Sequence, residues 1–214
     1  GKSTIGLSTL AYGRGGVRIT GGQVLLDGVD VTALASGDVR TIRGARVAYV
    51  AQSAAAAFNP AHKLGRQVIE AAVRHGIMTP AEAKKRAQYL FTVLGLPEPQ
   101  RFGERYPHQV SGGQLQRAMT AMALCARPEL IVFDEPTTAL DVTTQIEVLA
   151  AIKHAIAETG TAALYITHDL AVVAQVADDI MVLRHGKTVE YGSARQIIEA
   201  PREDYTKALV SIRQ

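Results

Sequence analysis

The chain has 214 residues, of which 47% are hydrophobic and 20% are charged, and its formal net charge at pH 7 is +3. These values describe a chain that buries one sizeable core, and they exclude a disordered tail, a collagen-like repeat and a disulfide-stapled miniprotein. So small a positive excess is weak evidence for a nucleic-acid surface, and we expect no nucleic-acid partner. The single cysteine, Cys125, can supply neither an internal disulfide nor a cysteine-rich metal centre, which favours a reducing compartment.

The N-terminal part of the sequence predicts a helix followed by extended segments. Residues 2–11 have the pattern of a helix, which the glycines at positions 13, 15 and 16 end. Residues 23–31 are predicted to be extended around the turn dipeptide Asp27-Gly28, and residues 46–50 to form a short strand that runs into Gln52.

The middle of the chain is predicted to be helical. An insertion spans residues 54–126, and most of its helical pattern begins at about position 61. Thr79, Pro80 and Glu82 match a helix start with a capping box and a proline at the first helical position. Gly95 then ends that helix.

Strands and helices alternate after position 129. Residues 130–133 and 162–166 are apolar strands, and residues 180–183 begin a hairpin that turns at His185-Gly186. A helix that Gly160 closes lies between the first two strands, with apolar residues at Ile146, Leu149, Ile152 and Ile156. Buried strands joined by amphipathic helices predict an α/β fold in which a parallel sheet is covered on both faces.

The first residues match part of a phosphate-binding motif. Gly1-Lys2-Ser3-Thr4, at the head of a helix, is the end of the pattern G-x-x-x-x-G-K-[ST]. Lys2 would place a positive charge on the β- and γ-phosphates of a nucleotide, and the Ser3 hydroxyl would be a ligand of Mg²⁺. Four residues alone are a weak signal, since a capped helix or a cloning remnant has the same pattern.

Two adjacent carboxylates support the phosphate motif. Asp134 and Glu135 follow an apolar strand, and the C-terminal ends of the strands are where α/β sheets bind ligands. Asp134 is suited to hold Mg²⁺, and Glu135 to orient or deprotonate an attacking water. Acidic residues are also common at the start of a solvated loop, but Pro136 and the phosphate motif favour the functional interpretation.

A second helix start is also suited to phosphate. In Ser111-Gly112-Gly113-Gln114 the glycines allow close approach of the backbone to a ligand, and the helix that follows buries apolar residues on one side.

Together these motifs resemble those of the nucleotide-binding subunit of ABC transporters. Residues 110–117 match the family's signature, residues 136–141 its D-loop, and residues 166–169 its switch-histidine loop, while Gln52 stands at the Q-loop. The motifs occur in the family's order within residues 1–169, and the ordered set is far more specific than any one of them.

The resemblance implies the fold in more detail. We expect a single ABC ATPase domain over residues 1–214, with a P-loop NTPase (RecA-like) core at 1–53 and 127–214, an antiparallel β portion and the helical insertion at 54–126. The chain starts at the last glycine of the phosphate loop, so we expect the domain to be truncated at its N-terminus. We also expect the preceding strand to be missing from beside the strand that ends at Asp134, and the binding of Mg-ATP to be far weaker than in an intact domain.

The resemblance also implies ATP and Mg²⁺ as cofactors and assigns roles to residues. Glu135 and His168 are the catalytic pair, and Mg²⁺ is held by Ser3, Gln52 and Asp134. The nucleotide-binding residues are Gly1, Lys2, Ser3, Thr4, Gln52, Ser111, Gly112, Gly113, Gln114, Asp134 and Asp141.

The partners implied by the family are a second ATPase subunit, identical or closely related, and separate membrane permease subunits that would dock near Gln52 and the helical insertion. A solute-binding protein would act indirectly, and the chain would lie at the cytoplasmic face of the inner membrane. The two ATPase subunits would pack head to tail, with ATP between the phosphate loop of one and the signature of the other.

The finer resemblance is to the ATPases of dipeptide and oligopeptide importers, through residues 58–60, 106–108 and 204–209. Ser53-Ala54 replaces the usual acidic residue and proline after the Q-loop glutamine. We also expect the subfamily's C-terminal extension to be absent. Nickel and glutathione importers share much of the pattern. A non-transport ABC-type ATPase and a module that binds ATP without useful hydrolysis are further alternatives.

Overall fold

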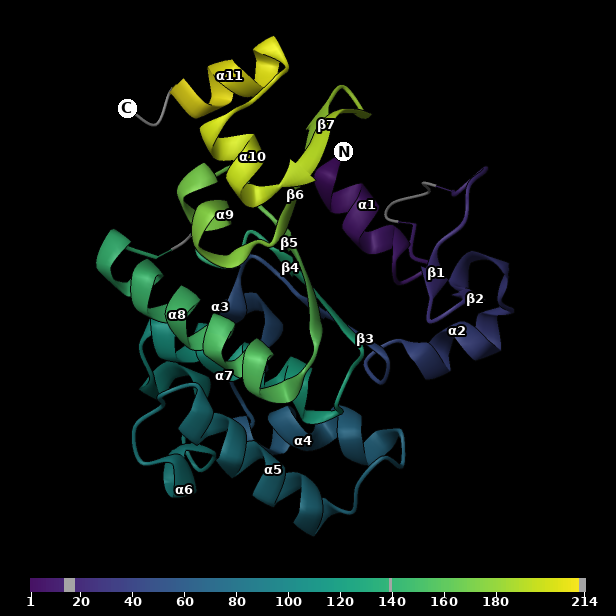
Figure 1. The fold of residues 1–214 in the computed structure, drawn as a ribbon. Coiled ribbons are helices and arrows are strands. Elements are labelled where there is room, and N and C mark those ends of the chain that lie inside the picture. The colour runs from purple at the N-terminus through teal and green to yellow at the C-terminus, as the bar shows by residue number, and fades with distance from the viewer. Residues whose placement is uncertain (14–17, 139, 212–214) are drawn as a thin grey trace.

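The computed structural model describes residues 1–13, 18–138 and 140–211. At its centre is a parallel sheet with the strand order β3-β4-β5 (Figure 1). These strands are β3 (Val47–Val50), β4 (Leu130–Asp134) and β5 (Ala162–Ile166), which confirms the strands predicted there.

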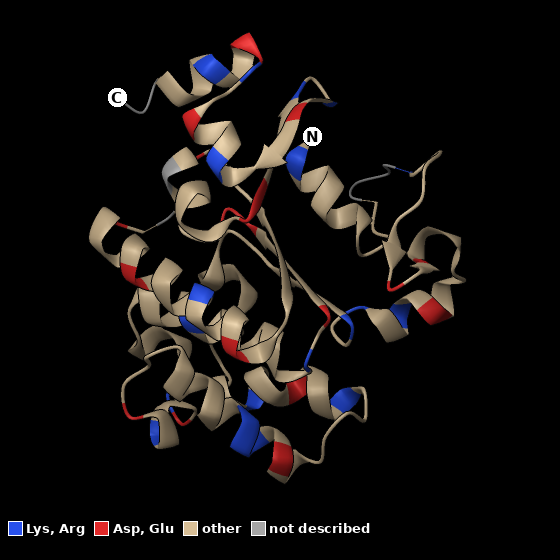
Figure 2. Ribbon diagram, viewed as in Figure 1, with Lys and Arg blue, Asp and Glu red and all other residues tan. Residues whose placement is uncertain are grey.

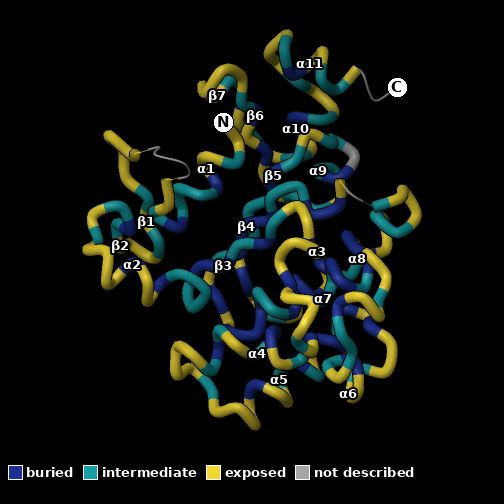
Figure 3. Tube along the Cα trace, turned by 180° about the vertical axis from the view of Figure 1, so that it is seen from behind, coloured by how far each residue is buried: buried dark blue, intermediate teal, exposed yellow. Residues whose placement is uncertain are grey.

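Successive residues of β4 point to opposite faces of the sheet and enter two different cores. Ile131 and Phe133 are buried against the helical insertion, whereas Val132 is buried on the other face together with Ile166 and Leu10. Figure 3 shows the buried positions running through the strands and the helices that cover them. A strand buried on both faces is continuously apolar, as the sequence indicated, and the expected parallel sheet with two covered faces is confirmed.

One prediction about the strands that neighbour β4 is wrong. β3 pairs with β4 along one edge and β5 pairs with it along the other, so both edges are occupied. The expectation that a preceding strand would lie beside the strand ending at Asp134 is therefore wrong. A further parallel strand could join this sheet only beside β3 or β5.

The helices between β3 and β4 form a layer on one face of the sheet (Figure 1). The Thr79 capping box is confirmed, with Thr79 N–H donating to the Glu82 carboxylate over 2.8 Å. The layer consists of α3 (Ala54–Ala57), α4 (Leu64–Arg74), α5 (Pro80–Val93), α6 (Pro99–Phe102), the 3₁₀ turn η2 (Pro107–Gln109) and α7 (Gly112–Cys125).

Helix α8 (Val142–Thr159) packs against α7 and joins β4 to β5. Gly160 ends it in the left-handed conformation, with φ of 65°, as predicted. Leu149 and Ile152 are buried, but Ile146 is 53% exposed although it belongs to the same stripe, so the apolar pattern extends further along the helix than the core does.

Helix α1 (Lys2–Ser8) lies on the opposite face of the sheet and ends three residues before the predicted boundary. The hydroxyl of Thr9 donates to the Gly6 carbonyl. Ala11 has a φ of 49°, a left-handed conformation with which a right-handed helix cannot continue. A side chain at Gly6 would collide with Ile166, so glycine is what lets α1 approach the sheet. The predicted stop at Gly15 and Gly16 lies outside the described residues.

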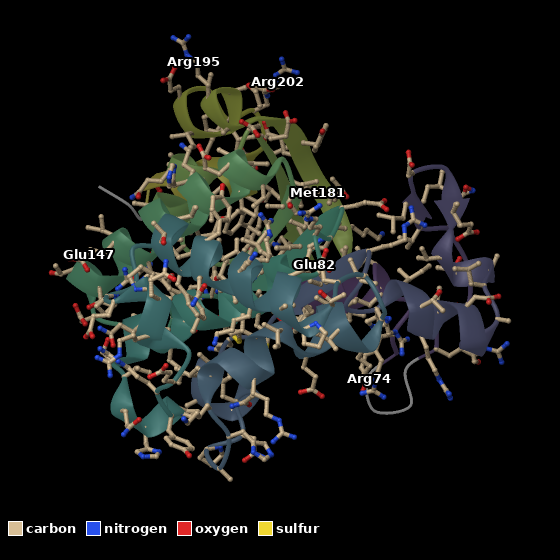
Figure 4. All side chains as sticks on the ribbon, turned by 90° about the horizontal axis from the view of Figure 1, so that it is seen from below. Arg74, Glu82, Glu147, Met181, Arg195 and Arg202 are labelled. Atoms are coloured by element: carbon tan, nitrogen blue, oxygen red, sulfur yellow. The ribbon has the colours of Figure 1, made fainter. Side chains whose placement is uncertain are left out.

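The remaining elements surround this core. Asp27-Gly28 turns the hairpin β1–β2, as predicted, and His185-Gly186 turns the hairpin β6–β7. In Figure 4, Arg195 and Arg202 project from the periphery of the C-terminal segment. The elements are β1 (Leu25–Leu26), β2 (Val29–Asp30), the 3₁₀ turn η1 (Val31–Ala33), α2 (Ser36–Ile42), α9 (Leu170–Val176), β6 (Asp179–Arg184), β7 (Lys187–Ser193), α10 (Ala194–Glu199) and α11 (Asp204–Ser211).

In the part of the chain that the structure describes, no helix combines the length and the apolar character that crossing a bilayer requires.

The packing of α7 on α8 gives a first prediction. A Cβ at Gly113 would lie 2.5 Å from Cγ2 of Thr144, a stiff β-branched side chain, so Gly113→Ala should lower the free energy of unfolding by about 1–3 kcal/mol. Gly112→Ala is the matched control, because its Cβ would meet Leu140 at an ordinary 3.5 Å. Urea unfolding measures both; equal midpoints for the two variants would contradict this account.

Candidate functional site

The ends of the three parallel strands bring polar residues from distant parts of the sequence together. Gln52 follows β3, Asp134 and Glu135 end β4, and His168 follows β5, all at the carboxyl edge of the sheet. Ser3, in the first turn of α1, reaches the same edge. Figure 2 shows acidic positions where β4 and β5 end, close to the basic start of α1.

Asp134 is held between α1 and β3. Its Oδ1 accepts a hydrogen bond from Ser3 Oγ over 3.1 Å, and its Oδ2 accepts one from the Tyr49 hydroxyl over 2.6 Å. Tyr49 was not predicted as a site residue. The signal that could have found it is a polar-tipped side chain within an otherwise apolar strand, at the residue before the last one of β3.

Glu135 turns the chain sharply at the end of β4. Its φ is 49°, a left-handed conformation that costs a non-glycine residue about 1–3 kcal/mol. Its N–H nevertheless donates to the Ile166 carbonyl over 2.8 Å, so the backbone is fixed to β5 at this position. The turn separates the two neighbouring carboxylates, and Glu135 contacts a different set of side chains from Asp134.

The Glu135 carboxylate has three side-chain partners. Oε1 is 2.9 Å from Nδ1 of His168, while Oε2 accepts from the Thr138 hydroxyl over 3.3 Å and from the Gln52 amide over 3.5 Å. The hydrogen bond from His168 is the main reason why the pKa of Glu135 is lowered from its ordinary value. Burial opposes this lowering, whereas the charge of His168, the Thr138 hydroxyl and the charge of Lys2 add to it. Since an ionised carboxylate only accepts, His168 must carry its proton on Nδ1, which leaves Nε2 for another group.

The second predicted helix start is built differently. Ser111 caps α7, with the Gln114 N–H donating to Ser111 Oγ over 3.3 Å and the Ser111 N–H donating to the Gln114 side chain over 3.1 Å. Gly113 packs against Thr144 of α8, and Gly112 lies near Leu140. Asp141 caps α8 through the Thr144 N–H at 3.0 Å, and this backbone hydrogen bond is the main cause of its lowered pKa.

The predicted residues therefore form two groups. Lys2, Ser3, Gln52, Asp134, Glu135 and His168 belong to the first, at the edge of the sheet, with Gly1 and Thr4 exposed beside them at the start of α1. The signature residues and Asp141 form the second. Within the described parts of the chain, no hydrogen bond or ion pair that we find joins the side chains of the two groups.

The first group suits Mg²⁺ better than a transition metal. Its donors are the Ser3 hydroxyl, the Asp134 carboxylate and the Gln52 amide, which are oxygen ligands, and Ser3 and Asp134 already lie within hydrogen-bonding distance. In residues 1–13, 18–138 and 140–211 there is no group of three His, Cys, Asp or Glu side chains that could hold a metal ion. Mg²⁺ needs few protein carboxylates when phosphates supply the other ligands, so the residues present fit it.

Comparison with known proteins gives one consistent result. The sequence model of the ABC transporter family matches residues 1–138. The chain is 39% identical to the "Probable peptide ABC transporter ATP-binding protein y4tR" of Sinorhizobium fredii over 99% of its own length and 63% of that protein. It is 40% identical to the "Dipeptide transport ATP-binding protein DppD" of Bacillus subtilis over 90% of its length and 58% of that protein. The chain thus spans less than two thirds of each relative.

A solved structure shares the fold. The ATP-binding cassette MJ0796, in a dimeric post-hydrolysis state bound to ADP and Pi, superposes with a TM-score of 0.74 and 28% sequence identity. The superposition covers 91% of this chain and 81% of that one. The predicted α/β cassette with a parallel sheet, antiparallel strands and helical regions is confirmed.

The contact between Glu135 and His168 gives the second prediction. In His168→Ala the pKa of Glu135 should rise toward the ordinary glutamate value, because the largest cause of its lowering is lost. Carboxyl ¹³C NMR through an acidic titration measures it. Glu82 at the start of α5 is the internal control. Its pKa is lowered mainly by the Thr79 hydroxyl and should be the same in the variant as in the wild type. An unchanged Glu135 titration would mean that the two side chains do not pair in solution.

Proposed function

This chain belongs to the ABC transporter family, and we propose that it is the ATP-binding and ATP-hydrolysing part of an importer that takes up peptides or a related small solute. The observation that carries the proposal is the pairing of Glu135 with His168 beside Asp134 and Ser3, at the edge where α/β sheets bind ligands. The similarity to peptide-transport ATPases supports the class of solute.

ATP would bind with its phosphates at the start of α1. Lys2 would contact the β- and γ-phosphates, with Gly1 and Thr4 beside it, because it is exposed and its charge contributes to lowering the pKa of Glu135. Ser3, Asp134 and Gln52 would hold Mg²⁺, which when bound neutralises charge that develops on the phosphates.

Glu135 and His168 would act on the water that attacks the γ-phosphate. The lowered pKa keeps Glu135 ionised at neutral pH, so its carboxylate is always available as a hydrogen-bond acceptor for that water. His168 donates from Nδ1 to Glu135 and would direct Nε2 to the γ-phosphate. The backbone of Glu135 is strained and is fixed to β5 through its N–H. Because strained residues cluster at functional sites, this strain supports a catalytic role for Glu135.

The signature would serve the nucleotide of a second subunit. Ser111, Gly112, Gly113 and Gln114 lie in the second group of residues, as does Asp141, so a nucleotide held by α1 would meet a signature only from a partner. Dimeric structures of MJ0796 support the presence of a second subunit. Membrane permease subunits and, indirectly, a solute-binding protein would complete a transporter, with this chain at the cytoplasmic face of the inner membrane.

The third prediction tests the catalytic role of Glu135. In the full-length protein, Glu135→Gln should keep ATP binding but lose turnover by about 10²–10⁴, because the neutral amide cannot act as a base. Phosphate release measures turnover, and a fluorescent ATP analogue measures binding. Turnover within a factor of about two of wild type would remove Glu135 from this role. A wild-type protein that binds ATP without releasing phosphate would favour the non-hydrolysing alternative.

The fourth prediction tests the signature. Ser111→Arg should prevent the ATP-dependent dimer while leaving ATP binding by the subunit itself unchanged, because Ser111 is exposed and lies outside the first group of residues. Size-exclusion chromatography in the Glu135→Gln background measures dimer formation. Lys85→Glu, a charge change on the exposed face of α5, is the control. A dimer that persists in Ser111→Arg would show that the signature does not face the partner's nucleotide.

A further inference from the structure

The helical insertion carries a small preformed pocket on its outer side, away from the residues of the proposed ATP site. The pocket has a volume of about 220 Å³ and lies between α4, α5 and α6. Ile69, Ala87 and Phe91 supply its apolar surface, and Lys63, Arg66 and Lys84 also line it.

The walls of this pocket are fixed by contacts of their own. Its floor is a close crossing of backbones, where the Gly65 N–H donates to the Gly103 carbonyl over 2.9 Å and a Cβ at either glycine would lie 3.0 Å from the other's Cα. Phe91 is held by Phe102, with ring centroids 5.1 Å apart. The pocket is therefore rigid before anything binds, which lowers the entropy lost on binding.

The charges at the pocket are unbalanced. Among the described residues, Glu104 is the one carboxylate that lines the pocket, and it pairs with Arg101 outside the pocket at 3.8 Å. In the same parts of the chain we find no ion pair for the three cations Lys63, Arg66 and Lys84. The insertion as a whole has nine Lys and Arg against four Asp and Glu, whereas the rest of the chain has 14 against 16. Figure 2 shows the basic positions on α4 and α5. The pocket thus combines an apolar interior with a rim on which cations outnumber carboxylates.

We propose that this pocket binds an acidic segment of a partner protein, which inserts one large apolar side chain and places carboxylates against Lys63, Arg66 and Lys84. The volume is below the roughly 300–1,000 Å³ of sites for drug-sized ligands, and it matches a single side chain. Unpaired cations around an apolar anchor point favour carboxylates beside that anchor. The inference deepens the proposed function, because a transport ATPase must bind other subunits.

The test uses a defined peptide, acetyl-Glu-Asp-Leu-Glu-Asp-amide, added to the methyl-labelled chain. We expect methyl shifts at Ile69 and Ala87, and no such shifts from the same peptide with Ala in place of Leu. Lys84→Glu should weaken binding about threefold to tenfold, because it replaces an attraction by a repulsion. Lys85→Glu is the matched control, since Lys85 has the same charge on the same helix but does not line the pocket.

Three results would overturn the proposal. The first is a lack of peptide shifts at Ile69 and Ala87; the second is equal weakening by Lys84→Glu and Lys85→Glu, which indicates non-specific charge attraction. The third is binding to vesicles containing anionic lipid that depends on Lys84 while the peptide does not bind, which would assign the surface to a membrane.

Phosphate release by the same wild-type protein separates the pocket proposal from the proposed function. If hydrolysis is normal and the peptide fails, the pocket proposal alone is wrong; if hydrolysis is absent and the peptide binds, the proposed function alone is wrong.

Discussion

The hydrogen bond from the Glu135 N–H to the Ile166 carbonyl is the contact on which the site depends. It adds one more pairing to the parallel ladder of β4 and β5 just where the chain enters a left-handed conformation. Without it, the strained backbone of Glu135 would relax, and the neighbouring carboxylates would lose their separate directions. With it, Asp134 faces Ser3 and Tyr49, and Glu135 faces His168.

Glycine positions decide how closely the helices approach this framework. Gly6 brings α1, and with it Ser3, against Ile166 and Val132, and Gly113 brings the start of α7 against Thr144 of α8. In both cases a neighbouring side chain of the same protein leaves no room for a Cβ atom, so glycine is required. For Gly113 this modifies the initial interpretation of the Gly-Gly pair, since one of the two glycines has a packing requirement that is independent of any ligand.

The sequence predicted the features that depend on local pattern. Apolar runs indicated β4 and β5, capping residues indicated the start of α5, the paired glycines indicated the start of α7, and adjacency indicated the carboxylates. It did not predict the partner of Asp134, because Tyr49 reaches it through the pairing of β3 with β4, which depends on tertiary structure. The central place of β4 and the exposure of Ile146 were missed for the same reason. A local pattern gives the period of a helix or strand but not which neighbours cover it.

The pocket in the insertion and the edge of the sheet share one core. Ala87 and Phe91 line the pocket, and they belong to the same continuous cluster of buried residues as Met119 of α7 and Phe133, the residue before Asp134. Because protein interiors are close-packed and yield little to compression, a side chain seated in the pocket would press on the core that also supports the end of β4.

Helix α7 contributes to both regions. Its buried side packs on α4, α5 and β3, and Ser111 caps its start. Contiguity alone does not make a switch, since coupling requires an element with two stable arrangements. The element best placed to have them is the segment from Gln52 to α3, because Gln52 contacts Glu135 at 3.5 Å over an exposed hydrogen bond while Ala54, two residues later, is buried in the shared core.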